Sequence, residues 1–125
     1  MKYKNVILPD GLKEKTLTFI KNIIDTFQKE NKLSALDGTA IYMLSGNLDT
    51  YLECEEQIKQ NGLIFISDRG NQSLSPYAIQ QKVVQSQIAV LLKELGLTLS
   101  SRNKMKLIAN EVEESPLASF IRQNG

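Results

Sequence analysis

Residues 34–62 read SALDGTAIYMLSGNLDTYLECEEQIKQNG, and their apolar positions recur every three or four residues without a change of phase. That spacing places Leu36 and the later apolar residues on one face of an α-helix. Ser34 is a suitable N-cap, Asp37 completes a variant of the capping box, and Gly62 suits the C-terminal end. The sequence therefore predicts one long helix over residues 36–61. Gly46 interrupts the pattern, and two helices divided there are the alternative.

The residues before this stretch predict an extended arm and an amphipathic helix. Pro9-Asp10-Gly11 has the composition of a turn that ends the arm. Apolar residues from Leu12 to Phe27 then recur at helical spacing, which predicts a helix over residues 12–31. Its outer face is predicted to hold a set of lysines: Lys13, Lys15, Lys21 and Lys29.

The residues after Gly62 predict a small β-hairpin and a further helix. A β-prone run over residues 63–66 precedes the turn-forming residues 68–71. Ser75-Pro76 is typical of a helix start, and the apolar residues that follow extend to Gly96, which suits a helix end. We expect the whole chain to be mainly α, with one small hairpin and a core built around the long helix.

Two of these elements indicate assembly with other subunits. A two-stranded hairpin is marginal in water unless it packs on helices or pairs with another chain. The last helix has apolar residues around much of its girth, so more than one side needs cover. The predicted oligomer interface consists of Ile64, Phe65, Ile66, Val84, Ile88, Leu91 and Leu92.

Composition argues against several classes of function. The 125 residues include no His and one Cys, which excludes His-dependent catalytic triads and Cys-rich zinc sites. No Gly-Lys-Ser or Gly-Lys-Thr phosphate-binding loop is present, and we expect neither a signal peptide nor a membrane helix. These exclusions fit the prediction of a protein that is not an enzyme, with no cofactor, no metal and no membrane partner. Cys54 lies among glutamates that disfavour its thiolate, so it is predicted to be a core or interface residue.

Charge is segregated along the chain although the formal net charge is +1. Residues 2–32 hold seven Lys against four acids, residues 37–56 hold five acids and no base, and residues 93–106 hold four bases against one acid. Solvated helix faces are one interpretation of these blocks. Complementary subunit surfaces, with basic faces for a polyanion, are the other.

Residues 95–102 read Leu-Gly-Leu-Thr-Leu-Ser-Ser-Arg and resemble the C-terminal signature Leu-Gly-Leu-Thr-Pro-Ser-Ser-Arg of a family of phage terminase small subunits. The order of a long helix, a hairpin and a Pro-started helix is also similar to that family, over about residues 34–108. Leu99 replaces the usual Pro, and Ser75 stands where Asn is frequent; both changes keep a helix start. A helix corner alone would account for Gly96 to Ser101, whereas Arg102 is not required by a corner.

The resemblance implies a non-catalytic subunit that assembles into rings. Such a subunit would recognise double-stranded phage DNA in the cytoplasm of the bacterial host and regulate the large ATPase and nuclease subunit. The chain would then divide into an arm and basic helix (residues 1–33), a small-subunit core (residues 34–110) and a tail (residues 111–125). A helix-turn-helix transcription regulator and a phage head or neck structural protein are the alternatives.

Two groups of residues are assigned to partners on this basis. The predicted DNA contacts are the four lysines of the N-terminal helix together with Arg102, Lys104 and Lys106, and the N-terminal set is favoured because it is larger. The tail has acidic residues followed by three apolar residues at positions i, i+3 and i+4, namely Leu117, Phe120 and Ile121. We expect these three to bind the large subunit, with packing on their own subunit as the alternative.

Overall fold

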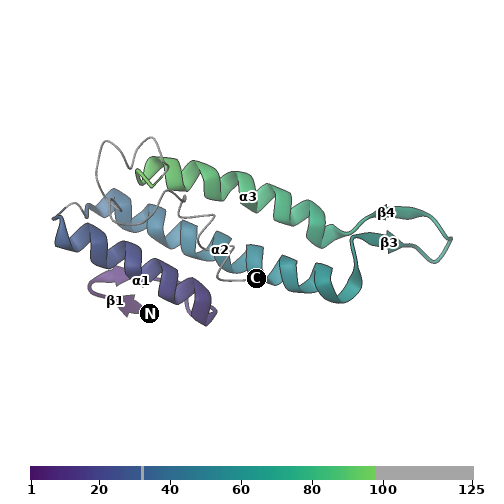
Figure 1. The fold of residues 1–125 in the computed structure, drawn as a ribbon, viewed down its shortest axis with the longest axis horizontal. Coiled ribbons are helices and arrows are strands. Elements are labelled where there is room, and N and C mark those ends of the chain that lie inside the picture. Colours follow the sequence, from purple (N-terminus) through teal and green to yellow (C-terminus); the bar gives the residue numbers. More distant parts are fainter. Residues whose placement is uncertain (32, 98–125) are drawn as a thin grey trace, which may run out of the picture.

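The computed structural model of the chain describes residues 1–31 and 33–97, and it is mainly helical, as predicted. Helix α1 spans Glu14–Lys29, α2 spans Ala35–Asn61 and α3 spans Pro76–Glu94. The three helices lie side by side, with α2 between α1 and α3 (Figure 1). The N-terminal helix is shorter at both ends than the sequence pattern predicts.

Two antiparallel strand pairs accompany the helices. Strands β3 (Ile64–Ile66) and β4 (Gln72–Leu74) form the predicted hairpin between α2 and α3, in the register Ile64↔Leu74. The hairpin extends past the adjoining ends of both helices (Figure 1). Strands β1 (Lys2–Tyr3) and β2 (Val6–Ile7) form a second, smaller hairpin at the N-terminus.

This N-terminal hairpin replaces the predicted extended arm. Its turn consists of Lys4 and Asn5, whose φ angles of 48° and 72° lie in the left-handed region. Asn tolerates that region better than most residues, but Lys does not, so Lys4-Asn5 is a weak turn signal in the sequence. Val6 and Leu8 are buried in the core and fix the hairpin to the helices.

Helix α2 runs through Gly46 without a break, which settles the choice between one helix and two. The predicted capping box is present: the Ser34 hydroxyl accepts a hydrogen bond from the Asp37 amide at 3.2 Å, and the Ser34 amide donates to the Asp37 carboxylate at 3.0 Å. At the other end, Gly62 has a φ of 83° and its amide donates to the carbonyl of Ile58. Local chemistry at both ends therefore defines the helix.

Helix α3 also begins and ends where the sequence predicts. The Ser75 hydroxyl accepts a hydrogen bond from the Tyr77 amide at 3.2 Å, ahead of the first turn. Gly96 has a φ of 76°, and the amides of Gly96 and Leu97 donate to carbonyls of the last turn at 3.0 and 2.8 Å. This pattern is a Schellman motif, and it directs the side chain of Leu97 into the core.

One hydrophobic core joins all three helices. In α2, Ile41, Leu44 and Leu48 are completely buried between the neighbouring helices. Leu36 is in phase with these residues but does not join the core, because 83% of it is exposed. The first turn of α2 lines an open groove beside α3 instead of packing against a helix.

Parts of the sequence-based prediction lie outside the described residues. These are the short helix expected after Thr98 and the tail over residues 111–125. Within residues 1–31 and 33–97, no helix combines the length and the apolar character needed to span a lipid bilayer.

Replacement of Gly46 tests the continuity of α2. An added Cβ at Gly46 meets no atom within 4 Å, and its backbone is helical. Gly46→Ala should therefore raise the free energy of unfolding by about 1 kcal/mol in urea denaturation, because Ala loses less backbone entropy in a helix. Gly62→Ala is the matched control and should lower it, because φ is +83° there. Destabilisation by Gly46→Ala would contradict a regular helix at this position.

Candidate DNA-contact and assembly surfaces

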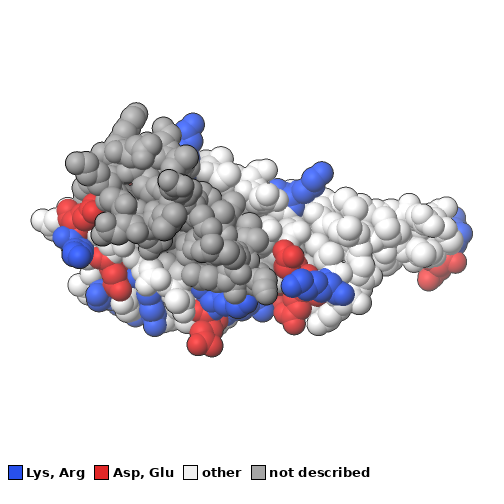
Figure 2. All heavy atoms as spheres, viewed as in Figure 1, with Lys and Arg blue, Asp and Glu red and all other residues white. Residues whose placement is uncertain are grey.

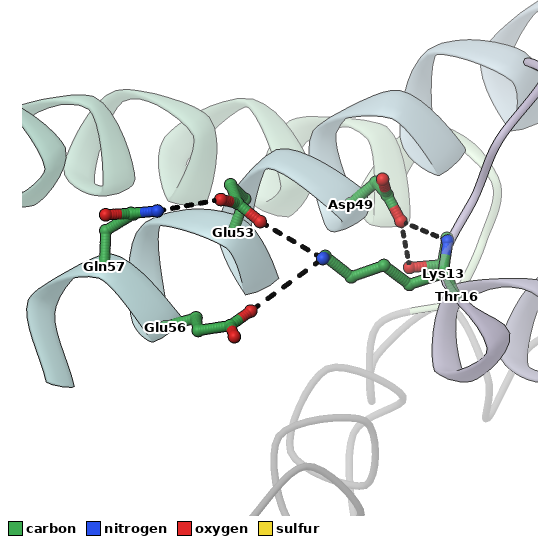
Figure 3. Close-up of polar contacts among 6 residues, drawn as sticks. All are labelled: Lys13, Thr16, Asp49, Glu53, Glu56 and Gln57. Atoms are coloured by element: carbon green, nitrogen blue, oxygen red, sulfur yellow. Dashed lines mark hydrogen bonds and ion pairs between the residues drawn. The ribbon is translucent and has the colours of Figure 1, made fainter. Parts of the chain in front are cut away.

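Lys13, one of the predicted DNA-contact residues, forms ion pairs inside the chain. Its Nζ atom lies 3.1 Å from the Glu53 carboxylate and 4.0 Å from that of Glu56 (Figure 3). The hydrogen bond to Glu53 raises the pKa of Lys13 above its usual value. A hydrogen bond from Gln57 and the contact with Lys13 lower the pKa of Glu53. Part of the acidic block of α2 is therefore balanced by α1 of the same subunit.

Asp49 joins α2 to the N-terminus of α1 at the same junction. Its Oδ1 atom accepts hydrogen bonds from the Lys13 amide at 2.8 Å and from the Thr16 hydroxyl at 3.0 Å (Figure 3). Thr16 is completely buried, and the α1 N-cap residue supplies no side-chain cap of its own. A carboxylate from α2 thus lies at the positive end of the α1 dipole. The sequence could not reveal this contact, because the partners are 33 and 36 positions apart.

The outer side of α1 has mixed charge. Asp25 accepts a hydrogen bond from the Tyr3 hydroxyl at 2.9 Å and pairs with the Lys4 ammonium at 2.8 Å, and these contacts lower the pKa of Asp25. Lys21 lies over the Tyr3 ring, 5.2 Å from its centroid, and Lys29 is exposed in the last turn. Basic and acidic side chains are interspersed along the α1 edge in Figure 2. Acidic side chains therefore lie among the predicted lysines along α1.

Of the remaining residues predicted to contact DNA or the large subunit, only Lys15 lies among the described residues. Lys15 lies in the first turn of α1 and lines a shallow cavity with residues of α2. Arg102, Lys104 and Lys106, and the tail residues Leu117, Phe120 and Ile121, lie outside the described residues.

The β3–β4 hairpin exposes the apolar residues predicted to mediate assembly. Ile64, Phe65 and Ile66 are each more than half exposed, and the flanking residues Leu63 and Leu74 are exposed as well. Side chains alternate between the two faces of a strand, so both faces of the hairpin present apolar groups.

The α3 residues of the predicted interface have a different location. Val84, Ile88, Leu91 and Leu92 are buried in the core of their own subunit. The large apolar residues of α3 that remain exposed are Tyr77, Ile79, Val83 and Val90, and the spacing of the last three places them on one face of the helix. These exposed residues differ from the four that the sequence pattern assigns to the interface.

The surface also has an apolar groove between α2 and α3. Its volume is about 690 Å³, and its lining includes Leu36, Ala40 and Met43 from α2 with Val90 and Leu91 from α3. Polar residues, among them Ser86 and Gln87, and the charged residue Glu94 complete the lining. The sequence predicted an apolar surface on α3 but not its combination with the first turns of α2.

The single cysteine is buried, and the described acidic residues do not gather into a metal-holding group. Cys54 is buried, as predicted, and burial together with the charge of Glu53 raises the pKa of its thiol. Among the described residues, no group of three or more Cys, Asp or Glu side chains could hold a metal ion. Helix α2 also continues past Gly46, so residues 36–45, the second candidate helix of the helix-turn-helix alternative, do not form a separate short recognition helix.

Removal of Asp49 should detach the start of α1 from α2. Asp49→Ala leaves the buried Thr16 hydroxyl without this acceptor, so we expect a loss of about 1–3 kcal/mol in the free energy of unfolding. Asp49→Asn keeps an acceptor oxygen and should lose less. Urea denaturation of both variants measures the difference, and equal stabilities of wild type and Asp49→Ala would refute the proposed link.

The Asp25 contacts should make stability fall in acid. Because the folded-state pKa of Asp25 lies below its ordinary value of 3.8, the unfolded chain binds the proton first as the pH falls. The contribution of Asp25 to the free energy of unfolding is complete well above pH 3.8, and it is lost as the pH falls below that value through the folded-state pKa. Asp25→Asn should therefore show a smaller drop in melting temperature from pH 7 to about pH 3 than wild type or the hairpin-turn control Asp68→Asn. An equal or larger drop in Asp25→Asn would contradict the assignment.

Comparison with known proteins gives a family match over most of the chain. The model of the family described as phage terminase, small subunit, matches residues 19–112. Neither a comparison with curated proteins nor one with solved structures found a match. The matched region includes most of α1, all of α2, the β3–β4 hairpin and all of α3. The chain therefore belongs to the phage terminase small subunit family.

Proposed function

We propose that this chain is the non-catalytic DNA-recognition subunit of a phage packaging terminase. The observation that carries the proposal is the family match over residues 19–112, which indicates a role in phage DNA packaging. In the proposed role, the subunit binds double-stranded phage DNA in the cytoplasm of the bacterial host. It then regulates the large subunit, which supplies the ATPase and nuclease activities.

The proposal includes assembly into a homo-oligomeric ring. Its support is the exposed apolar surface of the β3–β4 hairpin and of α3, which a soluble monomer rarely leaves uncovered over a large continuous area. A ring also presents the same basic residues many times to one DNA molecule, so weak contacts by each subunit add up to useful affinity. This multiplicity reconciles DNA binding with a net charge of only +1.

Within the N-terminal lysine set, the structure supports different roles for different members. We assign Lys13 mainly to stability, because Glu53 and Glu56 neutralise it. Lys21 and Lys29 are assigned to phosphate contacts, because Lys29 is exposed in the last turn of α1 and the ammonium of Lys21 lies over the Tyr3 ring, 5.2 Å from its centroid. Lys15, Arg102, Lys104 and Lys106 remain further candidates for DNA contact.

The proposed contact with the large subunit involves the tail. Leu117, Phe120 and Ile121 would bind a groove on that partner as one turn of helix, and the acidic residues before them would keep the tail away from DNA. This assignment rests on the sequence pattern.

Neutralisation of two lysines tests the DNA proposal. Lys21→Gln/Lys29→Gln should weaken binding to random-sequence duplex DNA, measured by fluorescence anisotropy at several salt concentrations. The slope of log K against log salt is negative, and its magnitude should decrease by about 0.9 for each phosphate contact that a bound subunit loses. The matched control is Lys59→Gln, which removes an exposed lysine from the last turn of α2.

The control should retain the wild-type affinity and slope. If the double variant also retains both, the assignment of phosphate contacts to Lys21 and Lys29 is wrong. If the wild-type oligomer shows no salt-dependent affinity for duplex DNA at all, the proposed DNA-recognition role fails.

A further inference from the structure

The β3–β4 hairpin has an aliphatic face that the described part of its own subunit leaves uncovered. The register pairs Ile64 with Leu74, and the alternation of side chains puts Ile66 on that same face. All three residues are exposed. Because the hairpin extends past the ends of α2 and α3 (Figure 1), this face lies away from the three-helix core.

The groove between α2 and α3 has a matching character and lies toward the opposite end of the helix pair. It involves the first half of α2 and the second half of α3, and it is lined by Leu36, Thr39, Ala40, Met43, Asn47, Ser86, Gln87, Val90, Leu91 and Glu94. Among these described lining residues, only Glu94 is charged. Met43 and Val90 are both more than half exposed.

The aliphatic face of the hairpin is short enough to fit in the groove. From Leu36 to Asn47, the α2 side of the groove is about 16 Å long at 1.5 Å per residue. From Ile64 to Ile66, strand β3 is about 7 Å long at 3.3 Å per residue. The aliphatic face of the hairpin can therefore lie within the length of the groove.

The charges of the two features are complementary as well. The hairpin surface is uncharged except at its turn, where Asp68 and Arg69 lie (Figure 2). The groove has its charged residue, Glu94, at the α3 end. If the turn of the hairpin points toward that end, Arg69 lies near Glu94 and the aliphatic side chains meet the apolar lining.

The hairpin cannot reach the groove of its own subunit. The α2 helix extends for about 27 Å between Met43 in the groove and Asn61 at the start of the hairpin. The helix is continuous over that distance, so it holds the two features apart. The groove that a hairpin fits must belong to another copy of the chain.

We propose that the Ile64, Ile66 and Leu74 face of one subunit docks in the α2–α3 groove of the next copy, with Arg69 directed toward Glu94. The proposal rests on the homo-oligomeric assembly proposed above and specifies its geometry. Each subunit donates a hairpin to one neighbour and accepts a hairpin from the other. Such a head-to-tail contact generates a ring when the rotation between neighbours closes.

Disulfide cross-linking of the full-length chain tests this geometry. Ile66→Cys and Met43→Cys replace side chains that are 62% and 52% exposed, so both should fold. The chain has one native thiol, Cys54, which is 2% exposed, and wild-type protein therefore measures the background. Under mild oxidation, the Ile66→Cys/Met43→Cys double variant should form a ladder of covalent oligomers, while each single variant stays at background.

A matched control separates the groove from the rest of α2. Tyr42 is adjacent to Met43 in sequence and is exposed, but it lines a different cavity near β2. The Ile66→Cys/Tyr42→Cys double variant should not exceed background. A ladder of equal yield from this control would overturn the proposal, because proximity would not be specific to the groove.

The other outcomes distinguish this inference from the proposed function. Cross-linking by Ile66→Cys alone would mean that hairpins pair with each other, and cross-linking by Met43→Cys alone would mean that grooves face each other; either result overturns the docking.

If sedimentation shows a wild-type oligomer but the Ile66→Cys/Met43→Cys variant stays at background, the hairpin docks elsewhere or residues 98–125 occupy the groove, and the docking fails while assembly stands. If the wild-type chain is a monomer at tens of micromolar, the proposed assembly itself fails.

Discussion

The burial of α2 on two sides is the constraint on which the rest of the structure depends. Its residues Ile41, Leu44 and Leu48 are completely buried, and removing each from water contributes about 1.5–3 kcal/mol. Helix α1 covers one side of α2 and α3 covers the other, so neither outer helix can shift without exposing this shared core. The two hairpins are then positioned by the helices: β1–β2 through its buried residues, and β3–β4 through its connection to the ends of α2 and α3.

The ends of the long helices could be predicted from sequence because they depend on local chemistry. Ser34 with Asp37, and Ser75 with Pro76, supply N-terminal caps within a few residues of the groups that they satisfy. Gly62 and Gly96 accept the positive φ angles that end α2 and α3. The family was also correctly identified from residues 95–102 and the order of elements, since a family is recognised by residue order without knowledge of contacts.

Which side of each helix faces the core could not be predicted from local sequence in the same way. Val83 and Val84 are adjacent and equally apolar, yet Val84 is buried and Val83 is exposed. Only the docking of α3 on α2 makes that distinction, and for the same reason Leu36 lies on the surface although it is in phase with the apolar pattern. Long-range polar contacts, such as that of Asp49 with Thr16, require the same tertiary knowledge.

The internal pairing of charge also restricts how the proposed DNA binding could work. Asp25 and Glu53 bind lysines of their own subunit, which reduces the positive potential that a single copy presents to phosphate. In the proposed role, affinity for DNA would come from several copies that act together, and association would not use the same charges. Among the described residues, the hairpin and the α2–α3 groove are apolar surfaces with few charges. Because the continuous α2 helix separates them, the proposed apolar contact would link different subunits and would leave the α1 surface of every copy available for the proposed DNA contact.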